Sequence, residues 1–397
     1  MNKHLDSLHP YPFEKLNGLV ADVTPPEGKK PISLALGEPT HRTPTFLIDA
    51  YCDPEMIANG FGTYPPTKGL LELREAIANF VTTRFNLSRA IDAGTEVLPV
   101  NGTREALFAI AQVLINGSGL TFIPNPFYQI YEGAAILAGS TTRFIPCDEA
   151  NNFNPDFSEI TKAEWEACSL VYLCTPGNPS GSIMSIEDLQ YVIRKSDEYK
   201  FAIVSDECYS EIYSKTPPPG LLEAASAMGR HDYKNCIAFN SLSKRSNLPG
   251  LRSGYACGDS EILEKFLLYR TYHGSAMPIQ NQRLSALAWE EEQHTIENRS
   301  LYAEKYEAFL KIVNPVWPMQ QPDAGFYLWP KTPIRDEEFT LQLLAQTNVK
   351  VVPGSYLARE VNGVNPGANR VRLAMVPELE KCVEAAQRIK HFLEHLR

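Results

Sequence analysis

The sequence lacks the features that mark a membrane protein or a nucleic-acid binder. None of its apolar runs approaches the roughly 20 residues needed to cross a bilayer, and the opening MNKHLDSLHPYPFEKL has no apolar stretch of the kind found in secretory signals. Positive charge is in deficit: 37 lysines and arginines face 47 aspartates and glutamates, for a net charge of −10. An acidic chain has no long-range attraction for phosphate backbones or anionic lipids. We therefore expect neither nucleic acid nor a membrane among its partners.

Paired cysteines are also missing. The eight cysteines form no CxxC motif, and several lie in apolar runs such as LVYLC and YACG. This pattern is typical of reduced thiols that pack as small hydrophobic side chains. It favours a cytoplasmic enzyme and gives no indication of a metal site. The cysteines are Cys52, Cys147, Cys168, Cys174, Cys208, Cys236, Cys257 and Cys382.

The chain of 397 residues has ordinary globular composition, with 44% hydrophobic and 21% charged residues. Between about residues 95 and 260, short and almost wholly apolar runs alternate with amphipathic helical stretches, which predicts a mostly parallel sheet between helical layers. The last hundred residues have an α+β pattern, with one long helix expected over about 276–312. We expect a large α/β domain over 46–289 and a smaller α+β domain made of 1–45 and 290–397.

Polar residues follow several of the apolar runs, where an open parallel sheet binds its ligands. Asn178 follows LVYLC, Asp206 and Tyr209 follow FAIVS, and SLSK at 241–244 follows CIAFN. NGTR at 101–104 follows EVLPV and opens a helix. Each motif alone is most often a turn, a helix cap or a surface residue. Their joint order is much less common among unrelated chains.

The chemistry of this set fits pyridoxal phosphate. A buried lysine amine can bond covalently to an aldehyde cofactor, and a carboxylate such as Asp206 can keep a pyridine nitrogen protonated, which makes the ring an electron sink. Asn178 and Tyr209 are suited to hydrogen bonds with a ring oxygen. The amides of a helix start, together with hydroxyls and a nearby arginine, suit a phosphate dianion.

The same segments resemble the class I/II aminotransferases, the fold-type I enzymes that use pyridoxal 5'-phosphate. The resemblance covers nearly the whole chain, and its most specific part is SxSK with the Gly-Leu-Arg-x-Gly-Tyr tail that follows. Such enzymes have a large, mostly parallel seven-stranded sheet sandwiched by helices, plus a smaller α+β domain. The similar segments are LGEPT at 36–40, GTYPPTKGLLELREAI at 62–77, NGTREALF at 101–108, NPFYQIY at 125–131, TPGNPSG at 175–181, SDECY at 205–209, SLSKRSNLPGLRSGYACG at 241–258 and RVRLAM at 370–375.

The resemblance implies a role for each matching residue. Lys244 holds the cofactor and moves the proton, while Asp206 pairs with the pyridinium nitrogen and Tyr209 acts with Asn178 at the ring oxygen. Arg372 grips the substrate α-carboxylate, with Asn178 and the backbone of Gly37 beside it. The remaining implied cofactor contacts are ring stacking by Tyr128 and phosphate contacts by Thr103, Arg104, Ser241, Ser243, Arg252 and, from the neighbouring subunit of a homodimer, Tyr64.

Two assignments depend on the family pattern alone. Arg370 and Arg372 are two residues apart and share a strand face, so spacing does not choose between them. Arg104 stands where small or polar residues are commoner, which leaves another role open for its side chain.

Other readings are weaker. A dehydrogenase would need GxGxxG after a strand, whereas Gly117–Gly119 lacks a third glycine and precedes one. The HxxEH at 391–395 lies on an amphipathic helix with two residues after it. A transcription regulator would need a separate DNA-binding domain, for which we expect no room before LGEPT. Decarboxylation, elimination and synthase chemistry stay open, since a fold does not choose among them.

The opening LDSLHPYPFEKLNGLVAD narrows the resemblance, since it is most similar to proteobacterial N-succinyldiaminopimelate aminotransferases. That likeness implies glutamate as amino donor and N-succinyl-2-amino-6-oxopimelate as acceptor, in lysine and diaminopimelate biosynthesis. The alternative is an aspartate, aromatic or broad-specificity aminotransferase of the same family. A long dicarboxylate also needs a second anchor, for which Lys15, Arg42 and Arg104 are candidates.

Overall fold

The computed structural model describes residues 1–58 and 60–396, and within these ranges seven strands form one large sheet in the order β2-β8-β7-β6-β5-β3-β4. All neighbouring pairs are parallel except those of β8, which runs antiparallel to β7 and to β2. The predicted mostly parallel seven-stranded sheet is therefore confirmed. The strands are β2 (Val97–Val100), β3 (Leu120–Asn125), β4 (Thr141–Pro146), β5 (Cys168–Cys174), β6 (Ala202–Asp206), β7 (Cys236–Ser241) and β8 (Gly254–Gly258).

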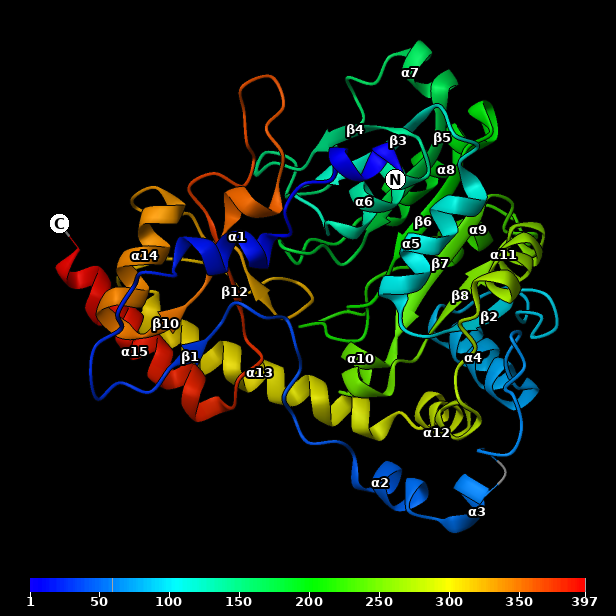
Figure 1. Cartoon of the computed structure of the whole chain (residues 1–397), viewed down its shortest axis with the longest axis horizontal. Coiled ribbons are helices and arrows are strands. Elements are labelled where there is room, and N and C mark those ends of the chain that lie inside the picture. Colours follow the sequence, from blue (N-terminus) through cyan, green and yellow to red (C-terminus); the bar gives the residue numbers. More distant parts are fainter. Residues whose placement is uncertain (59, 397) are drawn as a thin grey trace.

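Every residue of β2, β6, β7 and β8 is buried because both faces of the sheet are covered by helices (Figure 1). Successive residues of β5 show this, since Leu170 and Tyr172 pack into one hydrophobic cluster while Val171 and Leu173 pack into another. One cluster includes residues of α5 (Thr103–Leu114), α6 (Ile130–Leu137) and α11 (Ser260–His273). The other includes residues of α4 (Leu71–Arg84), α7 (Lys162–Ala167), α8 (Ile186–Tyr199), α9 (Leu221–Ala227) and α12 (Ile279–Glu290).

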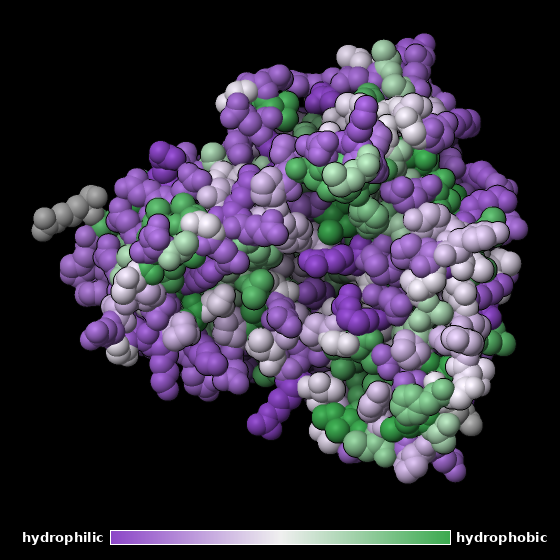
Figure 2. All heavy atoms as spheres, viewed as in Figure 1, coloured by the Kyte–Doolittle hydropathy of each residue, from purple (hydrophilic) through white to green (hydrophobic). Residues whose placement is uncertain are grey.

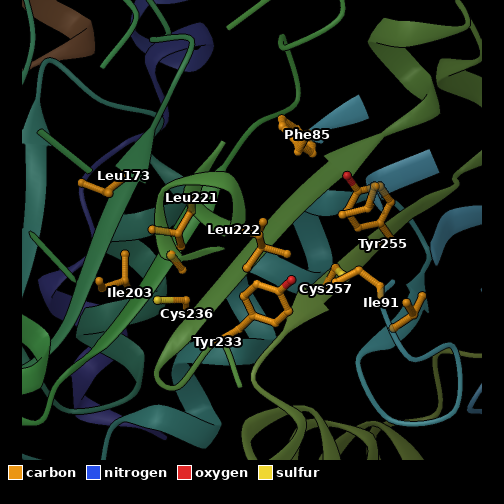
Figure 3. Close-up of a cluster of buried hydrophobic side chains, with 14 of the residues drawn as sticks. Phe85, Ile91, Leu173, Ile203, Leu221, Leu222, Tyr233, Cys236, Tyr255 and Cys257 are labelled. Carbon is orange, nitrogen blue, oxygen red and sulfur yellow. The ribbon is translucent and has the colours of Figure 1, made fainter. Parts of the chain in front are cut away.

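Cysteines take part in this second cluster, as the sequence suggests. Figure 3 shows Cys236 and Cys257 among buried side chains that include Leu221, Leu222 and Tyr233. Six of the eight cysteines are buried and all eight are free, while Cys52 is exposed. Buried free thiols here serve as small apolar groups.

A smaller unit combines an N-terminal segment with the C-terminal part of the chain, while the N-terminus itself lies beside α6 (Figure 1). Its strands are β1 (Ile32–Ser33), paired with β10 (Val349–Lys350), and a three-stranded sheet of β11 (Val352–Pro353), β12 (Val371–Ala374) and β9 (Tyr327–Leu328). Ile32 shares a hydrophobic cluster with residues of α13 (Gln293–Val313), α14 (Asp336–Thr347) and α15 (Leu379–His395). The division into a small domain of 1–45 and 290–397 and a large domain of 46–289 stays a prediction.

The remaining short elements connect these units. The N-terminal η1 (Lys3–Ser7) lies beside α6, and α1 (Pro12–Leu19) lies beside β11 and η3 (Gly354–Leu357). The helices α2 (Thr45–Tyr51) and α3 (Pro54–Ala58) lie beside α12. After β7 come α10 (Leu242–Arg245) and η2 (Pro249–Leu251).

The single long helix expected over 276–312 is wrong, because two helices, α12 and α13, occupy this stretch. The chain is extended at Glu291, with φ −96° and ψ 128°. The Glu291 carboxylate then accepts hydrogen bonds from the backbone N–H groups of Gln293 and His294, at 2.8 and 2.9 Å. A carboxylate that satisfies these free donors caps the start of a second helix.

Among the described residues, no helix combines the length and apolar character that a bilayer crossing requires. The same residues contain no group of three histidine, cysteine or acidic side chains arranged to hold a metal ion.

Candidate active site

The carboxyl ends of the central strands open into a cavity of about 250 Å³ that reaches the small unit. Figure 2 shows strongly hydrophilic residues around the hollow between the large sheet and the C-terminal elements. The cavity brings together most of the residues predicted from the sequence. Those that line it are Gly37, Thr103, Arg104, Tyr128, Asn178, Asp206, Tyr209, Lys244 and Arg372.

Lys244 projects from α10, directly after β7. Its Nζ donates a hydrogen bond to the backbone carbonyl of Gly37 over 2.6 Å and lies 5.2 Å from the centre of the Phe326 ring. Burial lowers the pKa of Lys244 to about 8. At pH 7 about a tenth of this lysine is therefore a neutral, nucleophilic amine, a much larger fraction than in an exposed lysine.

Asp206 ends β6 and is 4% exposed. Its Oδ2 accepts a hydrogen bond from the Tyr131 hydroxyl over 2.7 Å, and its Oδ1 accepts one from the backbone N–H of Cys208 over 3.3 Å. Burial raises the pKa of Asp206, while these hydrogen bonds oppose the rise. Among the described residues, no lysine or arginine forms an ion pair with it, so this buried carboxylate is suited to a cationic ligand.

Arg372 lies on β12 and is also 4% exposed. Its Nη1 donates to Asn178 Oδ1 over 3.0 Å, and its Nη2 donates to the carbonyl of Ala35 over 2.9 Å. Its Nε has no partner, and no carboxylate pairs with it within the part of the chain described. A buried guanidinium without a counter-ion is suited to a carboxylate ligand.

The structure separates the two arginines that the sequence left as alternatives. Arg370 donates to the carbonyl of Trp329 and to Glu149, at 2.9 and 3.0 Å. It lines a neighbouring cavity and not the one that contains Lys244. Arg372 is therefore the arginine available to a ligand in the candidate site.

A second cluster of predicted residues lies where α5 begins. Gly102 has φ 82°, and a side chain there would collide with the guanidinium of Arg252. Ser241 Oγ donates to Ser243 Oγ over 2.9 Å, and Thr103 Oγ1 lies 3.1 Å from Cys208 Sγ. A helix start with free N–H groups, hydroxyls and a guanidinium is suited to a phosphate.

Comparison with known proteins agrees with this geometry. The sequence model of the aminotransferase class I and II family matches residues 29–389. The chain therefore belongs to the class I and II aminotransferases. An aminotransferase of Neisseria meningitidis has 44% identity and a TM-score of 0.93, covering 99% of this chain and 100% of that one. The aminotransferase AspB of Helicobacter pylori has 33% identity and a TM-score of 0.88, covering 98% and 99%.

A further relative is the LL-diaminopimelate aminotransferase of Moorella thermoacetica. It is 27% identical over 98% of each chain. The family is dependent on pyridoxal 5'-phosphate, as the sequence predicts, and its members act on amino acids and 2-oxo acids.

The residues present in this aminotransferase fit its cofactor. The Lys244 amine suits the aldehyde, and the unpaired carboxylate of Asp206 suits a protonated ring nitrogen. The cluster at the start of α5, where only glycine fits at position 102, suits the phosphate. When bound, the cofactor supplies an electron sink for charge that develops at the substrate α-carbon.

Of two further predicted residues, one is exposed at the surface and the other lines the cavity. Tyr64 is 96% exposed and lies outside the cavity. Tyr209 lines the cavity, where its hydroxyl lies 3.2 Å from that of Tyr327.

Several residues in or behind the cavity were missed from the sequence. Tyr131 stands in the segment NPFYQIY, and Tyr11 and Phe13 stand in HPYPFEKL, yet nothing local indicates that they reach this site. Tyr327 stands in the strand-like GFYLWP, where the apolar pattern predicts a strand but does not indicate a place in the cavity. Their partners are distant in the sequence, so only the fold reveals them.

Proposed function

We propose that this aminotransferase transfers the amino group of glutamate to N-succinyl-2-amino-6-oxopimelate, in diaminopimelate and lysine biosynthesis. The observation that carries the proposal is the position of Tyr11 and Phe13, which line the cavity. They belong to HPYPFEKL, the segment most similar to N-succinyldiaminopimelate aminotransferases. The relative from Moorella thermoacetica, named for LL-diaminopimelate, supports a substrate of this chemical class.

In this proposal, Arg372 binds the substrate α-carboxylate, with Asn178 and the backbone of Gly37 beside it. Lys244 is placed to accept the α-proton at Nζ, because burial lowers its pKa and brings the neutral amine within reach of neutral pH. The same Nζ then donates this proton to the atom that receives it at the end of the proton shift. A lysine that leaves the cofactor when substrate binds can serve in both steps.

The other predicted residues hold the cofactor. Asp206 pairs with the ring nitrogen, Tyr209 and Asn178 serve the ring oxygen, and Tyr128 stacks on the ring. Backbone N–H groups and side chains hold the phosphate. These phosphate contacts are Thr103, Arg104, Ser241, Ser243 and Arg252.

We also propose a homodimer in which Tyr64 reaches the phosphate of the second subunit. Tyr64 and Phe61 are 96% and 77% exposed, an unfavourable state for aromatic side chains on a lone subunit. Figure 2 shows hydrophobic residues gathered on the surface near α2, α3 and α12. Free, mostly buried thiols fit a reducing compartment, and we propose the cytoplasm.

The substrate proposal is tested by comparing acceptors with glutamate as the common donor. We expect kcat/KM with N-succinyl-2-amino-6-oxopimelate to exceed that with oxaloacetate or phenylpyruvate by at least about tenfold. The donor half-reaction is the same in all three, so the ratio isolates acceptor recognition. Equal or better activity with oxaloacetate would contradict the proposal and favour an aspartate aminotransferase.

The alternative with structural support is an aromatic or broad-specificity aminotransferase. Tyr11, Phe13 and Tyr128 all line the cavity and give an aromatic side chain favourable surfaces to pack against. A preference for phenylpyruvate in the same comparison would support this alternative.

A further inference from the structure

The sequence offers Lys15, Arg42 and Arg104 as candidates for a second substrate anchor, and their positions relative to the cavity distinguish them. Arg104 lines the cavity. Lys15 and Arg42 do not line it, and both are exposed. The Lys15 ammonium lies over the Tyr356 ring, 5.6 Å from its centre. Of these three candidates, only Arg104 is therefore placed to meet a substrate.

Two tyrosine hydroxyls hold the guanidinium of Arg104 in place. Its Nε donates to the Tyr128 hydroxyl over 2.7 Å, and its Nη2 donates to the Tyr11 hydroxyl over 3.0 Å. The centres of these two rings lie 6.0 and 5.7 Å from the guanidinium carbon. Such contacts fix a flexible side chain before any ligand arrives.

The positive charge of Arg104 is not compensated. In residues 1–58 and 60–396, no carboxylate lies within ion-pair distance of it, and no hydrogen bond joins its Nη1 to another group. Glu38 also lines the cavity, but its charge acts on Lys244, where it opposes the fall in pKa. Arg104 thus retains a donor and a full charge for a ligand.

An aromatic wall connects Arg104 to Arg372. The Tyr11 ring lies beneath Arg104, and its centre is 6.0 Å from that of Phe13. The Phe13 ring centre lies in turn 6.0 Å from the guanidinium carbon of Arg372. The cavity therefore has a guanidinium at each end of a wall formed where α1 begins.

We propose that Arg104 binds the distal carboxylate of a long dicarboxylic substrate whose α-carboxylate lies on Arg372. The class of ligand is an amino or oxo acid with several carbon atoms between its two carboxyl groups. These carbon atoms pack on Tyr11 and Phe13. Charge-assisted hydrogen bonds from Arg104 add affinity for the second carboxylate. The inference rests on the proposed function for the placement of the α-carboxylate. The phosphate contact assigned to position 104 then falls to its backbone N–H.

Calorimetric titration of the holoenzyme with unreactive acids tests this assignment. The ligands are glutarate, adipate, pimelate and suberate, each paired with the monocarboxylic acid of the same length. We expect the wild type to bind the best diacid more tightly than its monoacid. In Arg104→Gln, that diacid advantage should fall by at least about tenfold. The exposed Arg42→Gln is the matched control and should keep the advantage.

Two results would overturn the assignment. One is a wild type that binds the diacid no more tightly than the monoacid, or whose preference for the diacid is not weakened by added salt. This result depends on the wild type alone, so it does not require any variant to fold. The other is an Arg104→Gln that keeps the diacid advantage, including one that weakens the diacid and the monoacid by the same factor, as expected if Arg104 only positions Tyr128. The titration uses no acceptor substrate, so it is independent of the kcat/KM comparison that tests the proposed function.

Discussion

The Tyr131 hydroxyl donates a 2.7 Å hydrogen bond to Asp206 Oδ2 at the bottom of the cavity, although 75 residues separate the two. Tyr131 is fully buried and stacks on Tyr172, with ring centres 4.7 Å apart. The hydroxyl supports the ionised form of this carboxylate and opposes the rise in its pKa that burial causes. Tyr131 is thus a positioning residue for the proposed partner of the ring nitrogen.

Tyr131→Phe should weaken turnover while the protein stays folded. The substitution removes one hydrogen bond to a charged group, so kcat should fall by about tenfold or more, and the pH dependence of the bound cofactor's absorbance should shift. Tyr172→Phe is the matched control, because its equally buried hydroxyl donates to the Leu107 carbonyl over 2.7 Å and not to Asp206. The same absorbance shift in both variants would contradict a specific role for Tyr131.

Asp206→Asn should have a larger effect, since the amide carries no charge to hold the ring nitrogen protonated. We expect kcat to fall about 100-fold or more, with the loss measured in enzyme saturated with cofactor. The neighbouring buried carboxylate provides the comparison: Glu207 accepts hydrogen bonds from Ser205 and from the Leu221 N–H, outside the cavity. Glu207→Gln should reduce stability more than turnover. Near-normal turnover in Asp206→Asn would refute the proposed role.

Lys244 should react with the cofactor aldehyde at an unusually low pH. Only the neutral amine is nucleophilic, and burial lowers the pKa of Lys244 to about 8 from the 10.5 of a free lysine. The rate of cofactor incorporation into the apoenzyme should therefore rise through about pH 8 and level off above it. Borohydride reduction followed by peptide mapping should place the label on Lys244, and Lys244→Ala should remove it. A rate that still rises towards pH 10.5, or a label on another lysine, would contradict the assignment.

Much of the site could be predicted because its residues follow the strands directly. Asp206 ends β6, and Lys244 follows β7 by three residues, so local sequence patterns place both at the same edge of the sheet. The choice of Arg372 could not be made in this way. Only the fold shows that Arg372 donates a hydrogen bond to Asn178 whereas Arg370 donates one to Glu149.

The contacts that could not be predicted join distant segments. Arg104 and Tyr11 are 93 residues apart, and their bond depends on how the N-terminal segment crosses the cavity. The break between α12 and α13 was missed for a different reason. It falls in the polar run EEEQHT at 290–295, which could equally continue a helix, and the capping by Glu291 is visible only in the structure.

Subunit mixing should show whether the active site is shared. The homodimers of Tyr64→Ala and of Lys244→Ala should each have low activity. In Tyr64→Ala the loss should come from weaker binding of the cofactor when its concentration is limiting. Because Tyr64 is exposed and remote from its own cavity, a mixed dimer should contain one site in which both residues are native. Random exchange of equal amounts should then restore about one quarter of wild-type activity. If exchange is demonstrated by mass and no activity returns, Tyr64 does not serve the second subunit.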